Sequence, residues 1–214
     1  MSADDPFIIV NTRPEYAEAL AAFQHVCYPT LPESDLFTAE DYRSHVRVFP
    51  EGQFTALLRN EGEDKIVAAT TTMRANFGEL PAHFMEFIGH NTLSTHDPKG
   101  AWLYGIDMSV HPAYRRLGLS RRFYAARATL VKRLGLRGEF VAGLLPGYER
   151  VRPHMSVEDY VTHVAAGKMT DPTLTPQLKS GFRVDRLLYG YVVDPRSDNI
   201  CTLLVRENSD FAET

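Results

Sequence analysis

The sequence contains few cysteines and no large excess of either charge. Its two cysteines, Cys27 and Cys201, show no CxxC or Cys/His spacing, which argues against a disulfide framework and against a zinc site. Its eight histidines include no HExxH motif, so no metal is expected. The formal net charge of -4 disfavours nucleic acid or an anionic membrane as the main partner, because both usually require a basic excess.

Long apolar runs are also missing. No stretch is long and apolar enough to span a membrane, and the acidic start MSADDPF lacks the regions of a signal peptide. Together with the sparse cysteines, this favours a reducing, cytoplasmic location. The 214 residues, with 44% hydrophobic and 23% charged content, have the composition of a globular protein. We therefore expect a single domain over residues 1–214.

Residue periodicity predicts an α/β protein with a mixed sheet. Seven strand-like runs are bounded by turn-forming residues, at 7–10, 53–59, 65–74, 101–110, 139–145, 182–193 and 201–206. Start and stop signals predict helices between Pro14 and Pro29, Thr38 and Pro50, Gly118 and Gly135, Ser156 and Gly167, and Asp171 and Gly181. The first helix is expected to bury one side formed by Tyr16, Leu20, Phe23 and Val26.

The segment 77–100 has no convincing period. It combines histidines, phenylalanines and two prolines between two predicted strands. Two interpretations remain open, an excursion over a binding face and a structural flap.

The stretch from Val110 to Arg122 predicts an anion-binding cradle. A strand-like run enters a basic turn that contains Gly118, and an amphipathic helix begins directly after it. The first amides of a helix lack intrahelical partners and lie at the positive end of its dipole. A diphosphate can therefore bind there, and Gly118 allows a close approach of the backbone.

These residues resemble the acyl-CoA loop of the GNAT N-acetyltransferases. That loop has Gln or Arg, two variable residues, Gly, one variable residue, and then Gly or Ala. Residues 115–120 fit every place except the last, where Ser120 stands. From about Thr95 onward, THDPKGAWLYGIDMSVHPAYRRLG, PGY, SVEDYV, DPTL and QLKSGF resemble a GNAT subgroup that is often fused to a nitrilase-type amidohydrolase.

The resemblance implies a GNAT fold, with a central, mostly antiparallel, seven-stranded twisted sheet, flanking helices and a V-shaped splay between the fourth and fifth strands. It implies acetyl-CoA as cosubstrate, without a metal. The cofactor contacts that it implies are Met108, Ser109 and Val110 along the pantetheine arm, and Arg115, Arg116, Leu117, Gly118, Leu119, Ser120 and Arg121 around the pyrophosphate.

Asp107 is the candidate catalytic base. It is an acid in an otherwise apolar strand, and burial would raise the pKa of its carboxyl toward a useful range. The alternative is that Asp107 caps a neighbouring amide or attracts a cationic substrate without moving a proton. Tyr104 occupies another position that family members use for a base, although tyrosine serves poorly as a base near neutral pH.

The general acid is not evident. In the family, a tyrosine four residues before a helix-ending Gly-Phe often protonates the departing thiolate, and Gln177 stands at that place here. Glutamine can donate a hydrogen bond but cannot act as a general acid. Tyr148 and Tyr160 lie near the fifth strand, and structural roles are favoured for both.

The helix after Gly118 is rich in arginine. We expect residues 115–122 to meet a CoA phosphate, and the arginines further along, including Arg127, to lie on a solvated face. A nucleic-acid groove is disfavoured, because aromatic residues do not alternate with the basic ones.

The sequence thus leads to the hypothesis of an N-acetyltransferase that acts by direct transfer to a primary amine. The expected acceptor is a small-molecule amine or a lysine-like group, with no nucleic acid and no membrane as partner. A homodimer and a separate amidohydrolase partner are compatible with the subgroup. The alternative is a non-catalytic CoA-binding or partner-binding module, motivated by Gln177 and by the frequent fusion.

Overall fold

The computed structural model describes residues 5–29, 31–60, 62, 64–78 and 80–212. Residues 1–4, which form most of the segment behind the signal-peptide expectation, lie outside the described residues. The same holds for residues 61 and 63 of the turn predicted between the second and third strands. Within the described ranges, no helix is both long and apolar enough to cross a membrane.

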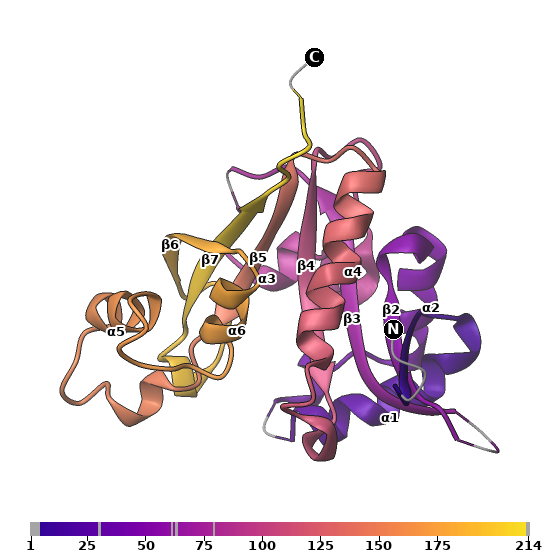
Figure 1. Ribbon diagram of the computed structural model, residues 1–214, viewed down its shortest axis with the longest axis horizontal. Helices are drawn as coiled ribbons and strands as arrows, with labels where there is room; N and C mark the ends of the chain where they lie inside the picture. Colours follow the sequence, from indigo (N-terminus) through magenta and orange to yellow (C-terminus); the bar gives the residue numbers. More distant parts are fainter. Residues whose placement is uncertain (1–4, 30, 61, 63, 79, 213–214) are drawn as a thin grey trace.

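One mixed sheet of seven strands forms the centre of the molecule (Figure 1). Its strand order is β1-β2-β3-β4-β5-β7-β6, and all neighbours are antiparallel except β4 and β5, which are parallel. The strands are β1 (Phe7–Asn11), β2 (Phe54–Leu58), β3 (Lys65–Ala75), β4 (Trp102–Val110), β5 (Gly138–Leu144), β6 (Arg183–Tyr189) and β7 (Ile200–Glu207). The predicted mixed sheet of seven strands is confirmed.

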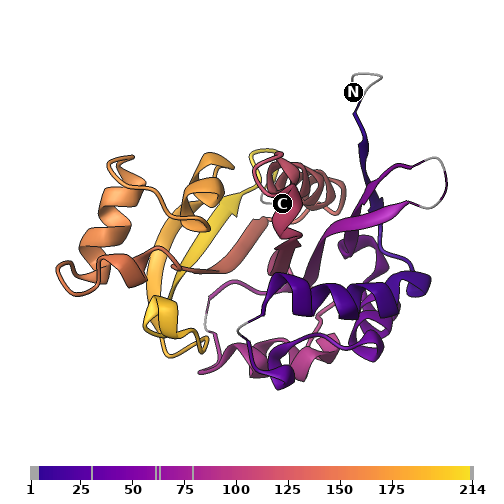
Figure 2. The ribbon, with the colours of Figure 1, turned by 90° about the horizontal axis from the view of Figure 1, so that it is seen from below.

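Helices cover both faces of this sheet (Figure 2). One face carries α4 (Leu119–Arg133), and the opposite face carries α1 (Ala17–Cys27) and α2 (Ala39–Val48). The short α3 (Phe84–Phe87) precedes β4, whereas α5 (Val157–Ala165) and α6 (Leu174–Lys179) lie beside the C-terminal strands.

Local capping groups start the helices where the sequence predicts. The Thr38 hydroxyl accepts a hydrogen bond from the Asp41 amide at 3.2 Å, and the Asp41 carboxylate accepts one from the Thr38 amide at 2.9 Å. The Ser156 hydroxyl accepts a hydrogen bond from the Asp159 amide at 3.1 Å. At the start of α6, the Asp171 carboxylate accepts hydrogen bonds from two backbone amides, those of Thr173 and Leu174. These starts depend on short-range contacts, and all three predictions are confirmed.

The buried side of α1 differs from the prediction. Val26 is 46% exposed, whereas Leu20, Phe23 and Cys27 are buried. The buried residues follow the three- and four-residue spacing of a helix, and each step along a helix turns the side chain by about 100°. Val26 therefore points away from the stripe that contains Cys27.

The segment 77–100 contributes to the core on the α1 and α2 face. Ile88 and Leu93 are fully buried, in one cluster with residues of α2, β3 and β4. A π-helical turn over Gly89–Leu93 contains positive φ angles, among them 51° at His90 and 69° at Asn91. Such a backbone has neither helical nor strand periodicity, which explains the missing pattern in the sequence.

Candidate functional site

The sheet divides where β4 and β5 part. Residues 102–105 of β4 pair with residues 138–141 of β5. Beyond these four pairs and among the described residues, β4 continues to Val110 with β3 as its partner strand, and β5 continues to Leu144 with β7 as its partner strand. The two strands thus form the predicted V, and each leaves one backbone edge free of a partner strand. Such an edge can bind an extended ligand chain.

A β-bulge at Ile106 sets the direction of Asp107. Thr71 is opposite Asp107 and Thr72 is opposite Gly105, so Ile106 is the extra residue of β4. Strict alternation from Gly105, which faces α4, would turn Asp107 toward α4 as well. The bulge turns it instead to the α1 face, as bulges commonly re-aim a side chain.

Residues at the C-terminal end of α1 hold the Asp107 carboxylate. Its Oδ1 accepts a hydrogen bond from the Tyr28 hydroxyl at 2.5 Å, and its Oδ2 accepts one from Gln24 Nε2 at 3.3 Å. Gln24 also donates to the Tyr42 hydroxyl of α2 at 2.7 Å. Burial raises the pKa of the Asp107 carboxyl, while the hydrogen bonds from Tyr28 and Gln24 oppose this effect. This environment suits a proton acceptor, and the catalytic role of Asp107 stays a prediction.

The chain between β4 and α4 has the geometry expected of an anion cradle. Gly118 caps α4 with a φ of 81°, and Arg116 before it has a φ of 65°. A Cβ atom added to Gly118 would meet no atom within 4 Å, so the space in front of the first α4 amides is open. Arg115 is exposed and its Nε donates to the Val110 carbonyl at 3.3 Å, which joins the turn to β4.

The other residues implied as cofactor contacts are adjacent to this cradle. Arg116, Leu117 and Arg121 are exposed, and Ser120 is half-buried. Leu119 is buried in the core, so its backbone amide is the group available to a ligand. Along β4, Met108 and Val110 are half-buried on the α4 face, whereas the Ser109 hydroxyl is buried beside Asp107. Their contacts with a cofactor stay predictions.

Two α4 arginines have roles that differ from those predicted. Arg122 forms an ion pair with Asp5 at 2.6 Å and donates to the Phe7 carbonyl, so it anchors β1 rather than lying free for a phosphate. The prediction of a solvated face is wrong for Arg127, which is 2% exposed. Its helix position turns it toward the sheet, where Glu139 of β5 neutralises its charge.

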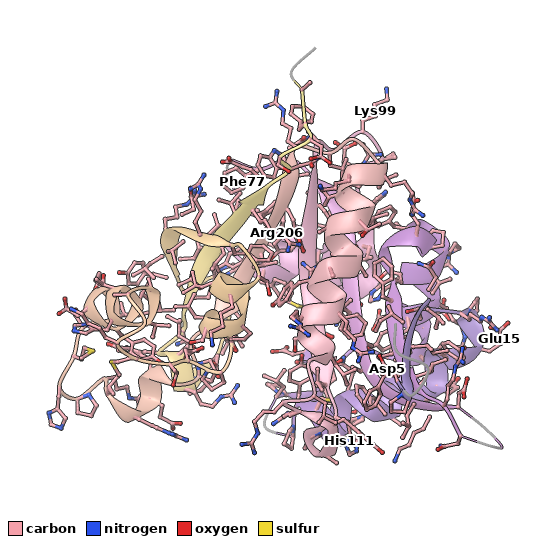
Figure 3. All side chains as sticks on the ribbon, viewed as in Figure 1. Asp5, Glu15, Phe77, Lys99, His111 and Arg206 are labelled. Carbon is pink, nitrogen blue, oxygen red and sulfur yellow. The ribbon has the colours of Figure 1, made fainter. Side chains whose placement is uncertain are left out.

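The Arg127–Glu139 ion pair is part of a buried cluster at the point of the V. Glu139 is 1% exposed, and its other oxygen accepts a hydrogen bond from Arg206 of β7 at 2.5 Å. Arg206 lies near the middle of the molecule, between the C-terminal strands and α4 (Figure 3). Gly105 leaves room for the guanidinium, because an added Cβ would lie 1.5 Å from Arg127 Nη2. Two cations and one anion thus lie beside the last β4–β5 residue pair, with Arg127 and Glu139 buried and Arg206 half-buried.

The two tyrosines named in the sequence analysis as candidate general acids, Tyr148 and Tyr160, both form structural hydrogen bonds. The Tyr148 hydroxyl donates to the Met155 carbonyl at 3.1 Å, and the Tyr160 hydroxyl donates to Asp171 at 2.9 Å, so both stabilise the loops around α5. Tyr124 of α4, which the sequence analysis did not single out, lies close to Gln177. In the sequence, the one sign that Tyr124 faces the V is its spacing of three residues from Arg127, which places both side chains on the same side of the helix. This spacing is informative only after the structure has shown that Arg127 is buried.

The segment 77–100 covers the opposite side of the β4–β5 junction. The Phe87 ring lies 4.8 Å from the Tyr104 ring, and the Phe77 ring lies 5.4 Å from the Phe140 ring. The Phe84 amide donates to the Tyr191 carbonyl beyond β6 at 2.9 Å. The segment therefore joins the two arms of the sheet across this face. Tyr104 is fully buried beneath it, and burial holds the pKa of the Tyr104 hydroxyl well above its usual range, which fits a core residue rather than a base.

Comparison with known proteins places these features in context. No protein-family model matches the chain. The chain is 30% identical over 207 residues to the probable hydrolase YhcX of Bacillus subtilis strain 168, covering 95% of this chain and 39% of that protein. It is 28% identical over 194 residues to the uncharacterized N-acetyltransferase YkwB of the same organism, covering 89% of this chain and 84% of that protein. The chain thus spans about two fifths of the length of YhcX.

A solved structure shows the same architecture. The chain resembles the GNAT-like decarboxylase GphF in complex with isobutyryl-CoA, with a TM-score of 0.72 and 27% sequence identity. The match covers 94% of this chain and 99% of that chain. That protein binds an acyl-CoA in the same fold.

Proposed function

This chain is a GNAT-fold protein, and from that premise we propose that it is an acyl-CoA-dependent N-acyltransferase. The reaction we propose is direct transfer of an acetyl group from acetyl-CoA to a primary amine, on a small molecule or a lysine-like group. The observation that carries the proposal is the continuity of the Gly118 cradle with the free edge of β4, which ends at the V beside Asp107. An anion site followed by an unpaired strand edge suits a ligand with a diphosphate and an amide-containing arm.

The residues present fit such a cosubstrate. The open space before Gly118 and the first amides of α4 would hold the diphosphate, with Arg116 and Arg121 exposed beside it. The edge of β4 from Met108 to Val110 would hold the extended arm. The acyl-CoA supplies an activated thioester.

Asp107 supplies the base in this proposal. A primary amine is protonated near neutral pH, so it must lose one proton to solvent before it can attack, and the Asp107 carboxylate takes the second proton as the nitrogen–carbon bond forms. The Tyr28 hydroxyl and the Gln24 amide fix the orientation of that carboxylate. The raised pKa of Asp107 brings its basicity closer to the working pH.

Thermal unfolding with and without acetyl-CoA tests the proposal. A ligand at one hundred times its Kd stabilises the native state by about 2.7 kcal/mol, which corresponds to a Tm increase of about 5–10 °C for a domain of this size. Gly118→Glu should abolish this increase, because it adds a carboxylate to the cradle. Gly118→Gln is the matched control for the strain at a φ of 81° and should keep most of it. A wild-type protein whose Tm is unchanged at saturating acetyl-CoA would contradict the proposal.

The similarity to GphF favours a second candidate function, decarboxylation of an acyl-CoA that carries a carboxylate. Decarboxylation, unlike acyl transfer, needs no amine. Mass spectrometry of the products formed from malonyl-CoA distinguishes decarboxylation from acyl transfer. Loss of carbon dioxide without an amine supports decarboxylation, whereas release of free CoA thiol that depends on an added amine supports transfer.

A further inference from the structure

A tyrosine side chain of α4 lies between the two arms of the V. Tyr124 is 7% exposed, and it belongs to one hydrophobic cluster with Val141, the last β5 residue paired with β4. Met108, from the free part of β4, packs against the same cluster. The helix that begins at the Gly118 cradle therefore also places a tyrosine beside the region where β4 and β5 diverge.

Gln177 of α6 connects this tyrosine to β5. A Cβ added to Gly143 would lie 2.6 Å from Gln177 Oε1 and 2.9 Å from its Nε2, so the amide lies directly against the strand. Burial raises the pKa of the Tyr124 hydroxyl and the Gln177 side chain opposes this effect, so the amide lies near that hydroxyl. Gln177 Oε1 is buried and has no hydrogen-bond partner among the described residues. A tyrosine hydroxyl thus reaches the neighbourhood of residue 177 from a different helix.

Two cations surround Tyr124. The Arg127 guanidinium carbon lies 5.6 Å from the centroid of the Tyr124 ring, and Arg206 Nη2 donates to the Tyr124 carbonyl at 2.9 Å. Burial raises the pKa of the Tyr124 hydroxyl, which keeps it protonated near neutral pH, while Arg127 acts in the opposite direction. Glu139, the ion-pair partner of Arg127, acts in the same direction as burial, so the hydroxyl is a proton donor at rest.

We propose that Tyr124 is the general acid that protonates the leaving thiolate and that Gln177 positions its hydroxyl. This inference rests on the proposed acyl transfer. As the nitrogen–carbon bond forms and the carbon–sulfur bond breaks, the electron pair of the latter goes to sulfur, and Tyr124 Oη gives its proton to that sulfur. Asp107 takes the proton lost by the amine. Solvent then removes the proton from Asp107 and returns one to Tyr124.

The test measures binding and needs no acceptor. Isothermal titration gives the Kd of CoA and of desulfo-CoA, which lacks only the thiol, for the wild type, Tyr124→Phe and Tyr148→Phe. Phenylalanine retains the ring contacts with Arg127 and Phe182, so the variant loses the hydroxyl alone. Tyr148→Phe is the matched control, because it removes a buried tyrosine hydroxyl that bonds a backbone carbonyl near α5.

We expect the wild type and Tyr148→Phe to bind CoA about fivefold more tightly than desulfo-CoA, the value of one net hydrogen bond, and more so as the thiol ionises at higher pH. In Tyr124→Phe the two affinities should become equal. An equal ratio of affinities in wild type and Tyr124→Phe overturns the assignment while leaving the CoA site intact. Failure of the wild type to bind either ligand overturns the proposed function itself, and the assignment with it.

Discussion

Replacing Gly105 by alanine tests whether the buried Arg127–Glu139 ion pair requires a residue without a side chain at position 105. The new Cβ would lie 1.5 Å from Arg127 Nη2, 2.5 Å from its Cζ and 2.7 Å from Val141 Cγ1. The guanidinium must therefore move away from Glu139. Since the two side chains are 2% and 1% exposed, neither reaches water without opening the core. Breaking a buried ion pair costs about 3–5 kcal/mol, and we expect the free energy of unfolding to fall by that amount.

Urea unfolding followed by circular dichroism measures this change. Gly62→Ala is the matched control, because Gly62 is exposed in the β2–β3 turn and a Cβ there meets no atom within 4 Å; its effect should stay below about 0.5 kcal/mol. In an Arg127→Met background the collision is relieved, so the two changes together should cost less than their sum. A Gly105→Ala protein within about 1 kcal/mol of the wild type would refute the reasoning.

Further predictions concern the carboxylate and a buried histidine. Asp107→Asn should lower kcat by about 10²–10⁴-fold while leaving the thermal shift by acetyl-CoA unchanged, and an unchanged kcat would remove Asp107 from proton transfer. Because burial raises the pKa of Asp107, kcat/KM should rise with pH through that raised value. Tyr28→Phe removes the donor at 2.5 Å, so the same pH profile should move to higher pH; a profile that stays in place would argue against Asp107 as the titrating group. Burial lowers the pKa of His45 from 6.5 to about 4, so the unfolded chain binds a proton more readily than the folded one. The contribution of neutral His45 to the free energy of unfolding is therefore fully present above about pH 6.5 and should fall by about 2 kcal/mol on acidification to pH 5. In urea titrations above pH 6.5 and at pH 5, the free energy of unfolding of His45→Gln should fall by clearly less. An equal loss in both proteins would show that another group is responsible.

Features that depend on neighbouring residues could be predicted from the sequence. Strand periodicity, the Thr38 and Ser156 caps and the turn at Gly118 all act over a few residues, and the structure has each of them. The V between β4 and β5 was accessible only through the family resemblance. Its cause lies in pairings among β3, β5 and β7 that no local pattern encodes.

Features that depend on distant residues could not be predicted. The burial of Arg127 in α4 requires Glu139 of β5 as an ion-pair partner and the absence of a side chain at Gly105 of β4. The direction of Asp107 depends on a bulge whose partner residues are in β3. Tyr124 could be recognised as a candidate functional residue only from the helix packing that places it beside residues of β5 and α6. In each case the sequence shows which residue is present, but its role depends on tertiary contacts with residues of other helices and strands.

The short β4–β5 ladder also affects how the molecule unfolds. In the described part of the chain, four residue pairs join the strands β1–β4 to the strands β5–β7, whereas β5 and β7 share seven. Cooperative unfolding as one unit therefore depends on cross-braces outside the ladder, namely the Arg127–Glu139 ion pair and the bond from Phe84 to Tyr191. We expect that weakening either brace lowers the cooperativity with which the two halves unfold. A molecule bound in the V would touch both halves, so we expect occupancy to couple their melting and to slow hydrogen exchange of the backbone amides along this seam.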